Sequence, residues 1–273
     1  GQDETTVAGL VALMSDRRRA VNQIRADAPF APQPQWEQNA RAAVEAAGVV
    51  FVAGDAERGA LAGLNLGGDT VPMAFPVAPS PAQMAPIGSL VGGEGYVLMH
   101  APLEPSQNQL QAARAAERAD LPLVIAGPVV DAGYAALVRA FAGPRVVVLG
   151  EPDPATAESL YRSAEVFLDA SWVGRGLVRA VRALSRGASL AISARLPAAD
   201  LGIGDFARPV DPADVDGIAR GLADAWYLRR EEAVRFTEAR IAAVARCALQ
   251  RTVRDLLGGY ARALRSRGAR SAR

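Results

Sequence analysis

The sequence contains no lysine, one cysteine and one histidine among its 273 residues. The single cysteine, Cys247, excludes an intramolecular disulfide and any zinc site built from cysteines. Because lysine is absent, all 30 basic residues are arginines; together with abundant alanine, glycine and valine, this indicates a G+C-rich bacterial genome. The glycine-rich segment 92–95 is followed by neither a lysine nor a helical pattern. It is therefore predicted to be a hinge turn, which excludes a phosphate-binding loop there.

Long apolar runs are also absent. No run approaches the roughly 18–20 residues that span a bilayer, and no signal peptide is visible, so we expect a cytoplasmic protein without a membrane span. The formal net charge of +1 gives no reason to expect nucleic acid, which binds a concentrated basic face. The chain begins at Gly1 without methionine, which is typical of a processed or engineered fragment.

What the sequence does contain is an α/β pattern with hydrophobic residues in half of its positions, enough to build one large or two smaller cores. Before residue 90 the pattern predicts helices over 4–26, 36–47 and 55–64, a strand over 48–53, and an irregular linker over 71–77 and 79–86. After Gly95, strands and helices alternate, which predicts a parallel sheet wrapped by helices. The expected strands are 96–99, 123–126, 145–150, 164–169 and 189–193.

The last third of the chain is predicted to be mainly helical. Asp211 and Pro212 are typical of a helix start, and two more helices are expected near 228–247 and 249–266. The basic segment 265–273 that follows is predicted to be disordered.

Residues 170–193, ASWVGRGLVRAVRALSRGASLAIS, combine a strand end, a glycine-rich turn, an arginine-studded helix and a second strand. This stretch resembles the signature of retaining family 4 (group 1) glycosyltransferases, which have the two-domain GT-B fold. Ser171, Gly187 and Ser193 fall on the serine, the second glycine and the final serine of that signature. The segment 96–108 adds Leu103, Pro105 and Asn108 at matching positions.

The resemblance covers roughly residues 36–265 and implies an α/β, GT-B-like fold. It implies a Rossmann-type parallel sheet in a donor-type domain over 91–250, preceded by a truncated N-terminal α/β portion and linker over 1–90. Residues 251–273 would form a C-terminal helix and a basic tail, and the final helices would pack back across the N-terminal portion.

Several positions depart from the family pattern in their chemistry. The two glutamates of the signature fall on Gly174 and Arg182, and the phosphate-binding arginine and lysine fall on Pro102 and Gln107. In the family the second glutamate accepts hydrogen bonds from ribose hydroxyls. Arginine carries five donors and no acceptor, so Arg182 does not replace it in that role. We therefore assign no catalytic residue.

Four arginines recur at spacings of four, three and four, which places them on one helix face: Arg175, Arg179, Arg182 and Arg186. One interpretation is a cationic strip at the interdomain cleft that binds phosphate, nucleotide or an acidic partner. The other is a solvated face, partly paired with nearby acids.

His100 ends the first strand of the larger sheet, where doubly wound folds place ligands, although a lone histidine also serves structural roles. Glu151 lies where the family often holds the base.

The predicted ligand-binding residues are thus His100, Gln107, Glu151, Gly174, Arg175, Arg179 and Arg182. Neither a cofactor nor a metal ion is expected. Three hypotheses follow. The first is a nucleotide-sugar-dependent glycosyltransferase of the family 4 type. The second is a non-catalytic pseudo-glycosyltransferase that binds a protein partner such as another glycosyltransferase. The third is a module that binds a nucleotide or other phosphate ligand.

Overall fold

The computed structural model describes residues 34–66, 68–74, 76, 85–87, 95–172, 177–196, 198, 207–231, 236–237, 240–241, 244–245 and 247–271. Their strands form a two-stranded sheet in the N-terminal unit (residues 34–74) and a six-stranded sheet in the six-stranded unit (residues 95–231). The helix predicted over 4–26 and residues 92–94 of the hinge predicted over 92–95 lie outside the described residues.

The six-stranded sheet is entirely parallel, with strand order β5-β4-β3-β6-β7-β8. The five strands expected from buried apolar runs are confirmed. A sixth, β8, was not predicted, because its sequence ARPV carries an arginine and a proline; an edge strand tolerates proline. The strands are β3 (Tyr96–His100), β4 (Leu123–Ala126), β5 (Val146–Val148), β6 (Ala164–Asp169), β7 (Ser189–Ser193) and β8 (Ala207–Val210).

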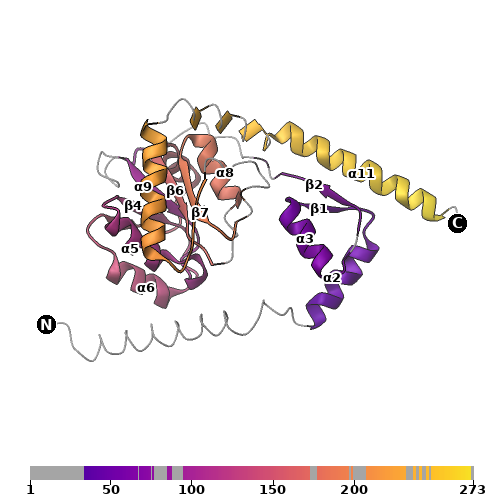
Figure 1. Ribbon diagram of the computed structural model, residues 1–273, viewed down its shortest axis with the longest axis horizontal. Coiled ribbons are helices and arrows are strands. Elements are labelled where there is room, and N and C mark those ends of the chain that lie inside the picture. Colours follow the sequence, from indigo (N-terminus) through magenta and orange to yellow (C-terminus); the bar gives the residue numbers. More distant parts are fainter. Residues whose placement is uncertain are drawn as a thin grey trace.

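Helices cover both faces of this sheet (Figure 1). Alternate side chains of a strand point to opposite faces. Accordingly Val97 and Met99 belong to one cluster, with residues of α5 (Gln109–Arg118), α6 (Ala132–Phe141) and α9 (Val215–Glu231). Tyr96 and Leu98 belong to the other, with residues of α7 (Pro154–Ser163) and α8 (Leu177–Arg186). The α/β fold with a doubly wound parallel sheet, predicted from sequence, is thereby confirmed.

The chain reverses its direction of winding between β3 and β6. From β3 it proceeds outward through β4 to β5, then returns to place β6 on the other side of β3. Doubly wound folds bind ligands at such a switch point, beyond the carboxyl ends of the strands. At this edge Gly127, which follows β4, has a φ of 141°, and a Cβ atom there would approach the carbonyl oxygen of Ala101 to 2.1 Å. Glycine is therefore required where the loops after β3 and β4 meet.

The N-terminal unit contains α2 (Pro34–Ala46), β1 (Val50–Val52), α3 (Asp55–Gly63) and β2 (Thr70–Pro72). The expected order of helix, strand and helix is confirmed. The expectation of an irregular linker from residue 71 is wrong at its start, because residues 70–72 form β2, parallel to β1. Val71 is buried and pairs with Phe51, and Pro72 ends the strand, so its missing N–H removes little pairing.

The helix α11 (Leu249–Ser271) confirms the helix expected near 249–266 and corrects the disordered tail, since helical structure continues to Ser271. It packs on the N-terminal unit: Thr252 Oγ1 donates a hydrogen bond to the carbonyl of Ala74 (2.8 Å), and Gly259 lies against the ring of Phe51. Figure 1 shows α11 reaching from the six-stranded unit to β1 and β2.

Two further helix boundaries differ from expectation. α9 begins at Val215, four residues after Asp211, whose carboxylate accepts a hydrogen bond from the N–H of Ala213. It continues to Glu231, so residue 228 belongs to α9 rather than to a new helix. Among the helices described, none is both long and apolar enough to cross a bilayer.

Candidate functional site

The carboxyl end of β3 carries His100 towards α7 and α8. Its side chain continues the face of Tyr96 and Leu98, because residues two apart in a strand share a face. There the Nδ1 atom of His100 lies 3.1 Å from the phenolic oxygen of Tyr161, a buried residue of α7. The two rings are 5.5 Å apart between centroids. Strand alternation thus accounts for the contact of the only histidine with these two helices.

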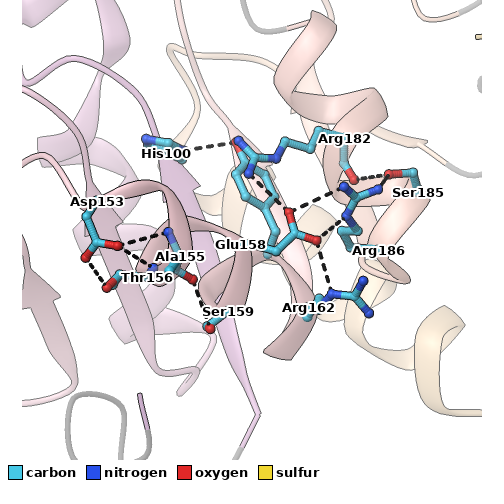
Figure 2. Close-up of polar contacts among 11 residues, drawn as sticks. His100, Asp153, Ala155, Thr156, Glu158, Ser159, Arg162, Arg182, Ser185 and Arg186 are labelled. Atoms are coloured by element: carbon cyan, nitrogen blue, oxygen red, sulfur yellow. Dashed lines mark hydrogen bonds and ion pairs between the residues drawn. The ribbon is translucent and has the colours of Figure 1, made fainter. Parts of the chain in front are cut away.

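A buried carboxylate, Glu158, lies one turn before Tyr161 and binds three arginines (Figure 2). Its Oε1 atom accepts hydrogen bonds from the Nε atoms of Arg186 (2.6 Å) and Arg162 (3.1 Å), and its Oε2 atom lies 3.2 Å from Nη2 of Arg182. The Glu158 side chain is 0% exposed and that of Arg186 is 11% exposed. A charge at this depth requires several charge-assisted partners, which the arginines supply.

Arg182 is held from a second side by Tyr161. Its guanidinium carbon lies 4.4 Å from the centre of the tyrosine ring, within the range of a cation–π interaction. Burial raises the pKa of the Tyr161 phenol to about 12, although Arg182 and Arg179 oppose the shift. Burial, with Arg179 and Arg182 as further causes, lowers the pKa of His100 to about 4. At neutral pH the histidine is therefore uncharged beside a protonated phenol.

Gln107 connects the loop after β3 to α8. This residue ends the short helix η1 (Pro105–Gln107), and its Oε1 atom accepts a hydrogen bond from Nη2 of Arg179 at 3.4 Å. The Nε atoms of Arg179 and Arg182 are buried, and no described residue accepts a hydrogen bond from either. Donors in excess of acceptors therefore gather between η1 and α8.

Asn108 fixes the position of Gln107. It adopts a left-handed conformation (φ 67°), which asparagine tolerates better than most residues. Its side-chain amide donates hydrogen bonds to the carbonyls of Ala170 (3.1 Å) and Pro212 (2.8 Å). The loop after β3 is thereby tied to the end of β6 and to the segment before α9.

The structure brings together four of the seven predicted site residues: His100, Gln107, Arg179 and Arg182. Glu151 is exposed after β5, and its charge reaches the Tyr161 phenol. Gly174 and Arg175 lie outside the described residues. In the part of the chain that is described, no group of three or more His, Cys, Asp or Glu residues is arranged to hold a metal ion.

Sequence reasoning missed Glu158, Tyr161 and Arg162. The pair Glu158 and Arg162 carried a usable signal, since residues four apart on a helix are neighbours. The contacts of Glu158 with Arg182 and Arg186 could not be predicted in this way. They join α7 to α8, and the hydrophobic periodicity of a helix does not specify which other helix it packs against. The interpretation of a partly paired arginine face fits Arg182 and Arg186, but both are more buried than a solvated face would be.

The fold of the chain is that of the GT-B glycosyltransferases. Sucrose-phosphate synthase from Thermosynechococcus elongatus is similar, with a TM-score of 0.68 and 17% identity over 89% of this chain and 63% of the other. HepE from Anabaena, solved in complex with UDP, has the same TM-score and identity over 89% of this chain and 74% of the other. A UDP-forming α,α-trehalose-phosphate synthase from Burkholderia xenovorans has a TM-score of 0.63 and 16% identity, over 85% of this chain and 66% of the other.

At these identities the likeness shows the fold alone. The chain spans less than two thirds of the length of the sucrose-phosphate synthase chain. No protein-family model and no curated protein sequence matches it.

Proposed function

We propose that this chain is a glycosyltransferase-like protein of the family 4 type whose donor-side cleft binds a nucleoside diphosphate or a related phosphate ligand but transfers no sugar. The observation that carries the proposal is the position of Arg182. It stands where the family pattern has its ribose-binding glutamate, and its guanidinium is paired with buried Glu158 and stacked on Tyr161.

The loss of transfer follows from the chemistry of these residues. Arg182 offers no acceptor for a ribose hydroxyl, and releasing it would weaken the compensation of a buried carboxylate. At the position of the other glutamate, Gly174 has no side chain to orient a donor sugar. Returning glutamate to position 182 alone would set a second carboxylate against Glu158. Restoring the family pattern at position 182 would therefore require changes in both α7 and α8.

The binding of an anion is supported by the charges that remain. Arg179 keeps a buried Nε donor that no described residue uses, and its contact with Gln107 is long at 3.4 Å. Burial is the main cause of the lowered pKa of His100, and the positive charges of Arg179 and Arg182 lower it further, so both arginines act on the end of β3. A diphosphate at this switch point would accept charge-assisted hydrogen bonds from Arg179.

A thermal-shift titration of the full chain with UDP, GDP, ADP, UDP-glucose and pyrophosphate tests the proposal. A ligand at about 100 times its Kd adds roughly 2.7 kcal/mol of stability, which gives a measurable rise in melting temperature. The variant Arg179→Gln is expected to bind at least about tenfold more weakly, since it removes a charge-assisted contact. Arg220→Gln is the matched control, because Arg220 is 70% exposed and belongs to α9, on the opposite face of the sheet.

Two results would count against the proposal: no shift with any diphosphate, or equal shifts for the wild type and Arg179→Gln. Release of UDP from UDP-glucose would contradict the part of the proposal that says the protein transfers no sugar. That result would favour the second candidate, a competent nucleotide-sugar-dependent transferase, which gains support from HepE, a structural neighbour solved with UDP and glucose. Absence of any ligand together with co-purification of another transferase would favour the partner-binding pseudoenzyme.

A further inference from the structure

One face of α11 carries a continuous row of large apolar side chains that no described residue covers. We call this row the apolar stripe; its residues are 44–70% exposed and are Leu249, Val253, Leu257, Tyr260 and Leu264. Their spacings of four, four, three and four keep them on one side of a helix. At about 1.5 Å per residue, the stripe is about 22 Å long.

The stripe lies beside the face by which α11 packs on the N-terminal unit, and the two meet at Tyr260, whose ring lies edge-on to that of Phe51 with 5.9 Å between the centroids. That inner face contains Thr252, Gly259 and Ala263, which contact Ala74, Phe51 and Gly48. With 3.6 residues per turn, the stripe is centred about a quarter of a turn away from the inner face. The exposure of the stripe is therefore not a result of poor packing, because α11 packs mainly through other residues.

Arginines lie along the outer edge of the stripe. The helical repeat places Arg254 and Arg265 on the side of the stripe away from the N-terminal unit. Both are exposed, and neither forms an ion pair with a described residue. Residues 249–271 include six arginines and one acid, Asp255. This strongly basic helix would repel a second copy of itself but would be attracted to an anionic surface.

The shape of this region fits a flat anionic surface. α11 is a straight helix at the outer edge of the molecule, beyond β1 and β2 (Figure 1), and the side chains of the stripe on it are exposed. A helix with aliphatic residues on one side and arginines beside them is typical of helices that lie in the interface of a bilayer. The arginine stems reach the headgroups, and tyrosine is enriched at the same level.

We infer that the apolar stripe of α11, with Arg254 and Arg265, docks the protein on the surface of an anionic lipid bilayer without spanning it. This surface shares no residue with the site at the end of β3, and docking does not depend on what that site binds.

Co-sedimentation of the full chain with vesicles tests the inference. Vesicles of phosphatidylcholine containing about one third phosphatidylglycerol are expected to bind the protein, and pure phosphatidylcholine vesicles to bind it much less. Binding should weaken as salt is raised. The double variant Leu257→Glu/Leu264→Glu should lose at least about tenfold in affinity, because it removes the two most exposed leucines of the stripe. Arg254→Gln/Arg265→Gln should also lose about tenfold or more.

Val130→Glu is the matched control, since Val130 is a similarly exposed apolar residue (62%) on the six-stranded unit. It should bind vesicles as the wild type does. All variants should keep the wild-type melting temperature, because every substituted side chain is exposed.

Failure of the wild type to bind anionic vesicles would overturn the inference, and so would equal binding by the Leu257→Glu/Leu264→Glu variant. A wild-type dimer that this variant dissociates, without vesicle binding, would instead assign the stripe to a second copy. Binding of an acidic amphipathic peptide but not of vesicles would assign it to a protein partner.

Discussion

Glu158 determines what the arginines of α8 are able to do. Two of the four arginines on the sequence-predicted face, Arg182 and Arg186, direct their guanidinium groups to this carboxylate. Arg179, one turn away, instead contacts Gln107 and keeps a buried donor unused by the described residues. A row that looks uniform in sequence therefore divides into an internal ion cluster and a residue, Arg179, that contacts the short helix η1 after β3.

Substitution of Glu158 tests how much this ion cluster contributes to the stability of the folded protein. Glu158→Gln should lower the free energy of unfolding by about 3 kcal/mol, because it leaves the charges of Arg182 and Arg186 partly buried without a compensating carboxylate. Urea denaturation measures the change. Arg162→Gln is the control: Arg162 is 46% exposed, so its loss should cost less than about 1 kcal/mol. Equal losses in the two variants would show that burial does not govern this cluster.

The residues of the site were only partly predictable. The positions of His100 and Gln107 near the site were predictable. His100 ends an apolar strand, and Gln107 lies in the segment 96–108 that resembles the family pattern. The arginine spacing also placed Arg179 and Arg182 on one face. Glu158 could not be assigned as their partner, since α7 and α8 meet only in the folded protein. Nothing in the sequence around this glutamate indicates that it is buried.

At the scale of secondary structure, buried parallel strands were the most predictable elements, because both of their faces are apolar and the run is continuous. The strands β2 and β8 were not predicted, because each contains a proline and neither is a continuous apolar run. The last turns of α11 were also missed. Their arginines and serines suggested a disordered tail, yet they continue an amphipathic helix whose packed face begins at Thr252.

Two adjacent glycines of α11 provide a test of how this helix packs. A Cβ atom on Gly259 would lie 2.5 Å from ring atoms of Phe51, whereas one on Gly258 would meet nothing within 4 Å. Gly259→Ala should therefore destabilise the protein by about 1–2 kcal/mol through overpacking. Gly258→Ala should stabilise it by up to about 1 kcal/mol, because alanine favours the helix. Hydrogen exchange of the α11 amides would report both effects, and changes of the same sign would contradict the close approach of α11 and Phe51.

At the scale of the whole molecule, the chain has a single histidine, so the pH dependence of the free energy of unfolding near pH 6 is attributable to His100. The pKa of His100 is about 4 in the folded protein, against 6.5 in the unfolded chain. Above pH 6.5 the imidazole is neutral in both states, so its contribution to stability is fully present. As the pH falls from 6.5 towards 4, only the unfolded chain takes up the proton, and the free energy of unfolding falls by up to about 1.4 kcal/mol per pH unit.

Urea denaturation between about pH 5 and 6.5, above the range where most carboxylates titrate, should show this slope. His100→Asn should flatten it, because no other side chain of the chain has an ordinary pKa in that window. An unchanged slope in the variant would mean that burial does not keep the imidazole neutral.

The contact between Gly259 and Phe51 also imposes an order on synthesis. β1 emerges from the ribosome well before α11, the helix that covers it. At translation rates of about 5–20 residues per second, the roughly 200 residues between them take about 10–40 s to emerge. During that interval Phe51 lacks its partner helix while the strands of the larger sheet are made. The N-terminal unit therefore cannot complete its packing until the six-stranded unit has been synthesised.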